Sequence, residues 1–371
     1  MKIQTIKEAE NGFLDSMYVI SHSDKTVSAY KTSINHLRKF LKSNYEMNEL
    51  ELLEQVKSEQ LDIFVVIRDF IVYLDKNGSQ ASAIQSYLSG LKGYLRYMGI
   101  RINTDDYKHL VKVPRRRKTR EIPITKELLI KLLRNANSKL QTAVIVASAS
   151  GLRIGELVQL RLSDIDFSEN PTILYIRGDT SKGKQSRETF LTAEATRTLQ
   201  DYLKKNFGWQ DNSPNTSLKD IHIFGRTSKE ITKPKAEFSV DSSTTALQKS
   251  LLHHISGHPE LNLKNENGNN AIHFHAFRKY FRTTVGNICG RDYAEALMGH
   301  GFYMDTYYQL PEDKKREMYL DAEPHLTISD FKEVEKNLKT LSMKYSELES
   351  KFNEFKQYTM TKSIQVPEYM K

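Results

Sequence analysis

A basic run bracketed by two prolines divides this chain of 371 residues. The run KVPRRRKTREIP, residues 112–123, includes Pro114 and Pro123 together with Arg115, Arg116, Arg117, Lys118 and Arg120. Like charges at this density repel one another and prolines interrupt helices, so the run cannot form a compact element of its own. We therefore predict a linker at residues 113–123. Its role stays open between a solvated tether and a strap that lies along phosphates.

The part of the chain before the linker has the periodicity of α-helices. Apolar residues recur at every third or fourth position in residues 23–44, 61–78 and 79–99, and Asn77-Gly78 ends the second stretch. Residues 1–20 are interpreted as a lead-in to these helices. Residues 1–112 are accordingly predicted to form a helical domain.

The part after the linker combines helices with a small sheet. The sequence predicts helices in residues 125–136, 139–151, 192–208, about 243–256 and 273–284. The stretch PTILYIRGDTSKGKQSRETFLT, residues 171–192, alternates in character and has turn residues in its middle, which predicts a hairpin. Residues 208–243 are interpreted as loop, and only a short tail segment is expected after YAEALMGHG. The fold class is therefore mainly α with a small β-sheet or hairpin.

The last part of the chain has a heptad pattern. Apolar residues alternate in steps of three and four from residue 331 to residue 355: Phe331, Val334, Leu338, Leu341, Tyr345, Leu348, Phe352 and Phe355. Such a seam predicts a coiled-coil helix within residues 329–371, which pairs with another chain or folds back on its own. Its aromatic positions are atypical of a dimeric zipper, so the stoichiometry stays open.

Composition narrows the class of partner. The net charge of +9 favours an anionic partner, with nucleic acid as the first candidate. Cys289 is the one cysteine, which excludes an internal disulfide and a cysteine-rich zinc site. We expect a soluble, intracellular protein, because the chain shows neither a signal-like apolar run near its start nor a stretch of about 18 apolar residues that could span a membrane.

Two segments place chemistry-bearing residues at helical spacing. In SASGLRIGELVQLRLSDIDF, residues 148–167, Gly151 ends a helix, and Arg153 lies at the start of the next one. A guanidinium beside free backbone N–H groups makes an anion site, although Arg153 could simply pair with Glu156. In HFHAFRKYFRTT, residues 273–284, His275 and Arg278 are three residues apart and therefore share a helix face.

These segments carry a resemblance to a known family. GLRIGELVQLRLSDID resembles the first signature of the tyrosine recombinases, the phage-integrase family, HAFRKYFRTT resembles its H-x-x-R box, and LMGH, residues 297–300, resembles its L-x-G-H box. The resemblance covers about residues 23–328. It implies a SAM-like core-binding domain at residues 1–112, which binds DNA, and an α+β catalytic domain at residues 124–328. Residues 329–371 would be an oligomerisation tail outside the family pattern.

The resemblance also implies roles for individual residues. Arg153 and Arg278 would hold the scissile phosphate, His275 would take a proton from the nucleophile, and His300 would add a hydrogen bond. Glu156 would orient Arg153 or support a lysine of the hairpin. In the family this lysine gives a proton to the leaving 5′-oxygen. Alignment of SKGKQSRETFLT with the family hairpin places Lys182 at this position, and Lys184 is the alternative.

The nucleophile is expected among the tyrosines that follow His300. The family usually has its tyrosine nine residues after the box histidine, where this chain has Gln309. A deletion of one residue in the loop would place Tyr308 there, and we prefer Tyr308 to Tyr307. Tyr303 is too close to His300 and is expected only to pack.

Together these residues predict a site-specific DNA recombinase or integrase of the kind found on mobile genetic elements. The resemblance implies that it acts through a 3′-phosphotyrosyl intermediate and a Holliday junction, as four protomers on two duplex sites. Arg115, Arg116, Arg117 and Lys118 would bind DNA. No DxD pair, HExxH motif or Walker loop is present, so we expect no metal, no ATP and no other cofactor. Two alternatives stay open, a type IB topoisomerase and a DNA-binding protein with a decayed active site.

Overall fold

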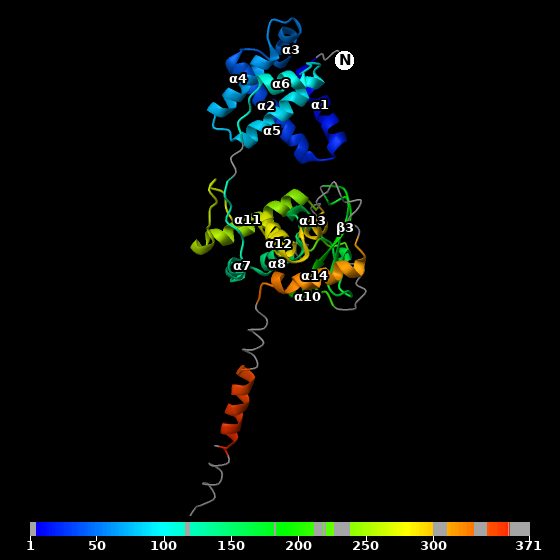
Figure 1. The fold of residues 1–371 in the computed structure, drawn as a ribbon, viewed down its shortest axis with the longest axis vertical. Coiled ribbons are helices and arrows are strands. Elements are labelled where there is room, and N and C mark those ends of the chain that lie inside the picture. Colours follow the sequence, from blue (N-terminus) through cyan, green and yellow to red (C-terminus); the bar gives the residue numbers. More distant parts are fainter. Residues whose placement is uncertain are drawn as a thin grey trace, which may run out of the picture. The chain divides into compact units, whose positions relative to one another are not determined.

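The computed structural model describes residues 5–115, 119–181, 183–210, 218, 220–225, 238–299, 310–329, 340–354 and 356. The chain divides into two compact units, Met1–Lys118 and Thr119–Lys371 (Figure 1). The division lies inside the basic proline-bracketed run. Within the second unit, the backbone N–H groups of Arg120 and Ile122 donate to the side chains of Glu266 and Asn265, both at 2.9 Å.

The described part of the first unit consists of helices. They are α1 (Ile6–Ser21), α2 (Asp24–Asn44), α3 (Glu49–Lys57), α4 (Ile63–Lys76), α5 (Ala81–Tyr97) and α6 (Thr104–Leu110). The side chains of Ser23, Asn48 and Asp62 accept hydrogen bonds from backbone N–H groups at the starts of α2, α3 and α4. The three helices predicted from periodicity correspond to α2, α4 and α5.

The interpretation of residues 1–20 as a lead-in was wrong, because Ile6–Ser21 forms helix α1. Ala9, Phe13 and Leu14 of this helix are buried in the core of the first unit. The Phe13 ring lies edge-on to Tyr30 with centroids 5.4 Å apart, and it also contacts Tyr94. The apolar residues of Ile6–Ser21 recur at helical spacing, so the sequence carried this signal and the interpretation overlooked it.

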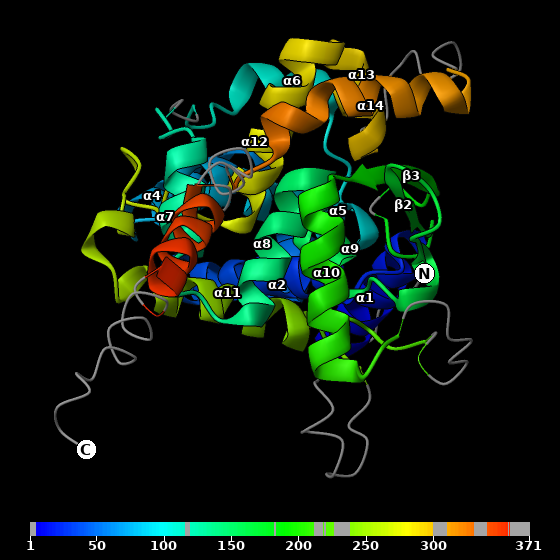
Figure 2. The same cartoon turned by 90° about the horizontal axis from the view of Figure 1, so that it is seen from below.

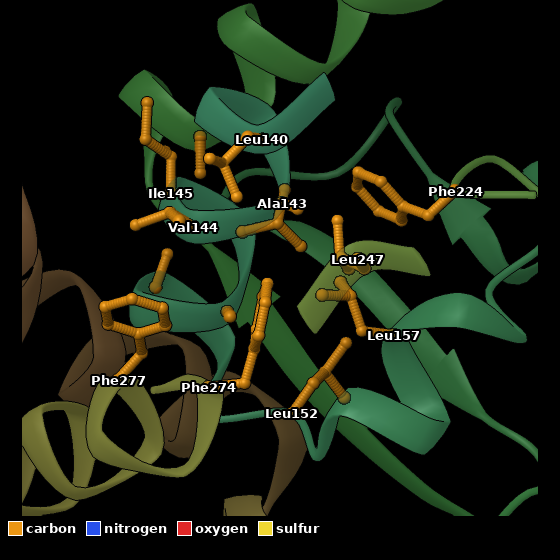
Figure 3. Packing of buried hydrophobic residues seen from close by; sticks show 14 of the residues in the cluster. Leu140, Ala143, Val144, Ile145, Leu152, Leu157, Phe224, Leu247, Phe274 and Phe277 are labelled. Atoms are coloured by element: carbon orange, nitrogen blue, oxygen red, sulfur yellow. The ribbon is translucent and has the colours of Figure 1, made fainter. Parts of the chain in front are cut away.

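The second unit is built around helix α8. Its helices are α7 (Lys126–Leu133), α8 (Ser138–Ser150), α9 (Ile154–Val158), α10 (Ala193–Phe207), α11 (Val240–Ser256), α12 (Phe274–Cys289), α13 (Arg291–Met298) and α14 (Glu312–Leu326). Helix α8 is buried on nearly all sides, and its small residues allow α10 to lie beside it (Figure 2). Phe274 and Phe277 of α12 pack against the α8 residues Ala143 and Val144 in one core cluster (Figure 3).

The predicted hairpin is present as part of a three-stranded antiparallel sheet. Strands β1 (Ile165–Asp166), β2 (Thr172–Ile176) and β3 (Arg187–Leu191) lie in the order β1-β2-β3. In the register of β2 and β3, Ile176 pairs with Arg187 and Thr172 pairs with Leu191. The fold is therefore mainly α with a small sheet, as predicted.

The short segment expected after YAEALMGHG contains helix α14, residues Glu312–Leu326. The side chain of Tyr319 is fully buried, and its hydroxyl donates to the carbonyl of Ala149 in α8 at 2.8 Å. This helix is difficult to predict from EDKKREMYLDAEPHL, because the stretch is highly charged and contains Pro324. Few of its side chains are buried, so its apolar periodicity is weak.

Residues 340–354 of the predicted coiled-coil region are helical. The seam residues Leu341, Tyr345, Leu348 and Phe352 each expose 65% or more of their surface. The remaining seam residues lie outside the described residues; they are Phe331, Val334, Leu338 and Phe355. Among the residues that the structure describes, no helix is both long and apolar enough to cross a membrane.

Candidate active site

The turn between α8 and α9 places Arg153. Helix α8 ends at Gly151, whose φ of +66° is left-handed and whose N–H donates to the carbonyl of Ala147 at 3.1 Å. A Cβ atom at Gly151 would lie 2.4 Å from the ring of Phe281. Both the left-handed backbone and this close contact therefore require glycine at the position. Arg153 is the extended residue that precedes α9, which agrees with the predicted start of a new helix.

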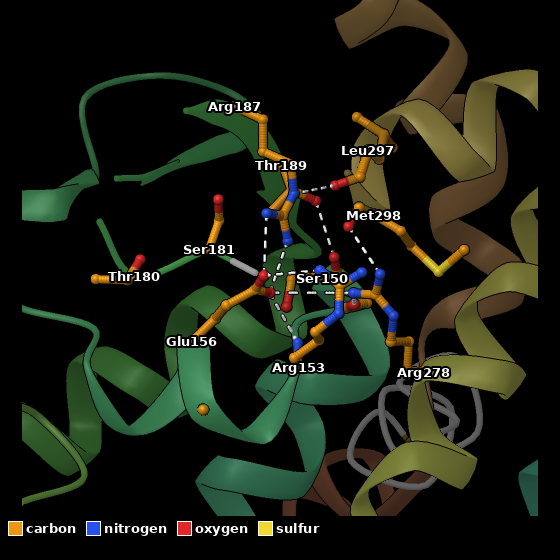
Figure 4. A network of polar contacts seen from close by, with 12 residues as sticks. Ser150, Arg153, Glu156, Thr180, Ser181, Arg187, Thr189, Arg278, Leu297 and Met298 are labelled. Carbon is orange, nitrogen blue, oxygen red and sulfur yellow. Dashed lines mark hydrogen bonds and ion pairs between the residues drawn. The ribbon is translucent and has the colours of Figure 1, made fainter. Parts of the chain in front are cut away.

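The carboxylate of Glu156 is the centre of a polar network (Figure 4). Its oxygens accept from the backbone N–H of Arg153 at 2.9 Å and from the Nη1 atom of Arg153 at 3.0 Å. They also accept from the Nη1 and Nη2 atoms of Arg187 at 3.2 and 2.7 Å. Arg153 and Glu156, which are three residues apart, therefore form an ion pair. Arg153 still exposes 28% of its side chain, so the ion pair does not enclose the guanidinium.

Glu156 is ionised although it is buried. Burial alone would raise the pKa of this carboxyl, but the hydrogen bonds and charge of Arg187, followed by those of Arg153, hold the pKa below its ordinary value. A carboxylate that already accepts four hydrogen bonds has little capacity left as a base. Through these bonds it holds the guanidinium groups of Arg153 and Arg187 in place.

Arg278 is buried in the second unit, with 2% of its surface exposed. Its guanidinium donates to the carbonyl of Gly151 and, from Nη2 at 2.8 Å, to the carbonyl of Met298. Its Nη1 atom lies 4.0 Å from Glu156. Burial and the neighbouring charge of Arg153 lower the pKa of Arg278 to about 10. A guanidinium that is desolvated beside a second cation favours an anion as its ligand.

One guanidinium nitrogen of Arg278 has no hydrogen-bond partner in the described part of the chain. The Nε atom is buried and has no hydrogen-bond partner among the described residues. Buried N–H groups are nearly always paired in folded proteins, so an unpaired one next to a cleft marks a place for an acceptor.

His275 and Arg278 line the same cleft. The cleft has a volume of about 330 Å³ and is lined by His275, Arg278, Lys279, Arg282, Thr283 and Met298. The imidazole of His275 remains exposed to solvent. Partial desolvation and the nearby cations, Lys279 first, lower the pKa of His275 below its ordinary value. His275 is therefore neutral near pH 7 and can accept a proton.

The neighbouring charged residues on α12 are already paired. Arg282 forms an ion pair with Glu295, and Lys279 forms one with Glu121. His273 precedes α12, and its Nδ1 atom bonds the carbonyl of Ala271 at 2.9 Å, which agrees with a structural role. Among the two arginines of this helix, Arg278 is thus the better candidate for an anion ligand.

The hairpin contributes a residue that sequence reasoning did not assign to the site. This residue is Arg187, whose side chain donates to the carboxylate of Glu156 and to the carbonyl of Leu297. Lys184, the alternative to Lys182, does not lie on a strand. Strand β2 ends at Ile176, β3 begins at Arg187, and Lys184 lies between them with a φ of +54°.

Several predicted site residues lie outside the described residues. They are Lys182, His300, Tyr307 and Tyr308 and, in the linker, Arg116, Arg117 and Lys118. Tyr303, which was expected only to pack, also lies outside them. Arg115 is described and exposed. The described residues contain no group of three or more His, Cys, Asp or Glu side chains that could hold a metal ion.

Comparison with protein families identifies two matching regions. Residues 101–301 match the model of the phage integrase family. Residues 12–99 match the model of the phage integrase N-terminal SAM-like domain.

The chain is also similar to curated proteins. It is 25% identical over 322 residues to "Tyrosine recombinase XerC" of Leptospira interrogans, a match that covers 80% of this chain and 93% of that protein. It is 24% identical to the protein of the same name from Staphylococcus aureus, covering 85% and 96%. The XerC of Chlamydia caviae is 28% identical, but the match covers 52% of this chain and 65% of that protein.

Solved structures have the same fold. A lambda integrase fragment, residues 75–356, solved as a dimer bound to a COC′ core site, has a TM-score of 0.56 at 17% identity, covering 83% of this chain and 99% of that chain. A lambda integrase tetramer bound to a Holliday junction has a TM-score of 0.54, also at 17% identity, covering 85% and 79%. At these identities the likeness concerns the fold.

Proposed function

Since this chain belongs to the phage integrase family, whose members are tyrosine recombinases, we propose that the cleft beside Arg278 binds the scissile phosphate of a recombination site. The chain is a DNA strand-transfer enzyme of the tyrosine type. The finer assignments concern which residues act and how the protomers assemble.

The unpaired, buried Nε atom of Arg278 is the observation that supports this site most directly. A phosphodiester carries one negative charge, and charge grows on its non-bridging oxygens as a nucleophile attacks phosphorus. Arg153 and Arg278 come from different elements and meet around Glu156, so their donors are fixed before substrate binds. Fixed donors in a partly dehydrated cleft stabilise such charge more than mobile water does.

The covalent step uses residues on both sides of this phosphate. The Tyr308 oxygen forms a bond to phosphorus while the bond from phosphorus to the deoxyribose 5′-oxygen breaks. His275 accepts the tyrosine proton, Lys182 donates a proton to the leaving 5′-oxygen, and His300 donates a hydrogen bond to the phosphate. A 5′-hydroxyl from the partner duplex then reverses the step. Because the phosphotyrosyl link conserves the bond energy, joining requires neither ATP nor a metal.

The remaining parts of the chain would bind DNA around this centre. Residues 1–112 act as the core-binding domain, residues 113–123 as the linker and residues 124–328 as the catalytic domain. Arg115, which is exposed, would contact DNA phosphates together with Arg116, Arg117 and Lys118. Double-stranded DNA inside the cell is thus the partner, and four protomers on two sites would carry out two rounds of exchange.

The tail would hold protomers together. Residues 340–354 form a helix whose four described seam residues are exposed, and a helix of this length is only marginally stable in water by itself. Pairing with the same segment of another copy would bury the seam. Residues 329–371 are therefore assigned to oligomerisation.

An assay with two kinds of plasmid tests the function. Duplexes that the protein binds are first selected from a random library, and two copies of the selected site are placed on one plasmid. With EDTA present and ATP absent, we expect exchange between the two sites and little relaxation of a site-free supercoiled plasmid. Relaxation without exchange would favour a topoisomerase, and binding without strand breakage would favour a decayed enzyme.

A further inference from the structure

Arg187 is enclosed by the site and uses three of its donors within the protein. Its side chain, at the first residue of β3, is 9% exposed. Two donors bind the Glu156 carboxylate, and Nε donates to the carbonyl of Leu297 at 2.9 Å (Figure 4). This geometry leaves Arg187 poorly placed to contact DNA directly.

The charges around Glu156 explain why a third arginine is needed. Arg153 and Arg278 are the arginines assigned to the phosphate, and both have a guanidinium nitrogen within 4.0 Å of the Glu156 carboxylate. With these two alone, the carboxylate would neutralise one of the two positive charges that the phosphate requires. Arg187 makes the shortest ion pair with Glu156, at 2.7 Å, and so balances its charge.

We propose that Arg187 is the counter-ion of Glu156 and that it leaves Arg153 and Arg278 with their charges available to the scissile phosphate. Glu156 can then orient Arg153 through hydrogen bonds without cancelling its charge. Arg187 is a positioning residue in this account, because it acts through Glu156 and touches no reacting atom. The inference rests on the proposed phosphate site.

The same side chain also joins three segments of the site. Arg187 belongs to the hairpin that contains Lys182, Glu156 belongs to α9, and Leu297 is near the end of α13. Gly299, the residue before His300, has a φ of +67°, and a Cβ atom there would lie 2.7 Å from the Cδ atom of Arg187. The arginine therefore packs against the backbone that leads to His300.

A charge-matched pair of variants separates the counter-ion role from a purely structural one. Arg187→Gln leaves Glu156 without its main counter-ion, and Glu156→Gln together with Arg187→Gln removes both charges. The rate of covalent adduct formation is measured for the full-length proteins on a nicked duplex carrying the selected site. We expect Arg187→Gln to slow adduct formation by about 10- to 100-fold, as when partners that orient active-site ligands are removed.

The double variant then decides the matter. If Arg187 balances the charge of Glu156, the double variant forms adduct at least about tenfold faster than Arg187→Gln, within the range of such effects. Arg187→Lys, which keeps the charge and loses the fork, should lie between Arg187→Gln and the unmodified protein. A double variant that is folded, binds the duplex and is no faster than Arg187→Gln would overturn the proposal.

Thermal unfolding of the unmodified protein, Arg187→Gln, Glu156→Gln and the double variant gives a second test that does not depend on activity. Replacement of Arg187 should lower the unfolding midpoint more when residue 156 is Glu than when it is Gln, because only a carboxylate is left unpaired. The unmodified protein could form no adduct while the effect of replacing Arg187 still depends on residue 156. That result would contradict the proposed function but would support the ion pair between Arg187 and Glu156. Equal shifts in both backgrounds would overturn the counter-ion role itself.

Discussion

The Nη2 atom of Arg278 donates a 2.8 Å hydrogen bond to the carbonyl of Met298, two residues before His300. The arginine assigned to the phosphate therefore also holds the end of α13. Its other anchor is the carbonyl of Gly151, at the turn that leads to Arg153. Arg278 thus connects the two segments that contain the other predicted phosphate ligands, and changes at any of these positions should affect the others.

Replacement of Arg278 by lysine should slow cleavage strongly, and it should also lower stability because the buried carbonyls of Gly151 and Met298 lose a donor. Lysine keeps the charge but cannot reproduce the fork of donors, so adduct formation should fall by about 10²- to 10³-fold. Arg282→Lys is a matched control, because Arg282 lies one turn away on the same helix and is paired with Glu295. Gel assays of adduct formation check both. Similar losses in the two variants would argue against the special role of Arg278.

Gly151 should be irreplaceable, and Gly155 should not. Gly151→Ala introduces a left-handed alanine, at a cost of about 1–2 kcal/mol, and a Cβ atom that overlaps Phe281. The variant should lose more stability than that figure and should bind DNA poorly, because Arg153 is displaced. A Cβ atom at Gly155, in helix α9, meets nothing within 4 Å, so Gly155→Ala should change stability by no more than about 1 kcal/mol. Chemical denaturation measures both, and equal effects would contradict this account of the turn.

The pH dependence of cleavage should report a His275 with a lowered pKa. A general base acts when it is unprotonated, so the second-order rate should rise with pH through a pKa below the ordinary 6.5 and level off above it. Among the charged neighbours, Lys279 lowers the pKa of His275 most, whereas the carboxylate of Glu121 raises it. Lys279→Gln removes the positive charge and also leaves Glu121 without its ion-pair partner. Both changes raise the pKa of His275. The rising limb should therefore move to higher pH in the variant, and an unmoved limb would exclude His275 as the base.

Removal of the tail should weaken assembly more than cleavage at a single site. The deletion should begin after Ser329, because Ile328 is buried and Glu194 accepts hydrogen bonds from the N–H groups of Ile328 and Ser329, at 2.6 and 2.8 Å. Light scattering should show smaller particles for the truncated protein, with single-site adduct formation unchanged within a few-fold.

A point variant tests the seam itself. Leu348→Glu places a charge on the seam and should reproduce the loss of assembly, whereas Ser346→Glu, on the same helix away from the seam, should not. Unchanged assembly in the truncated protein and in Leu348→Glu would refute the oligomerisation role.

Local patterns predicted much of the site. Gly151 marked the end of a helix, the spacing of Arg153 and Glu156 predicted their ion pair, and the spacing of His275 and Arg278 placed them on one cleft. These relationships depend on a few neighbouring residues, so the sequence contains them directly.

Relationships between distant segments could not be predicted in the same way. Arg187 meets Glu156 only because β3 packs against the α8–α9 region, 31 residues away in the chain. Tyr319 likewise anchors α14 through a contact with Ala149 that no local pattern reveals.

Covalent trapping tests the central claim most directly. The protein is incubated without divalent metal on nicked duplexes that carry the selected site, beside Tyr308→Phe and Tyr307→Phe, and adducts are separated on a denaturing gel. We predict an adduct for the unmodified protein and for Tyr307→Phe, and none for Tyr308→Phe. Loss only in Tyr307→Phe would move the nucleophile by one residue, and the absence of an adduct from the unmodified protein on a site that it binds would contradict the account.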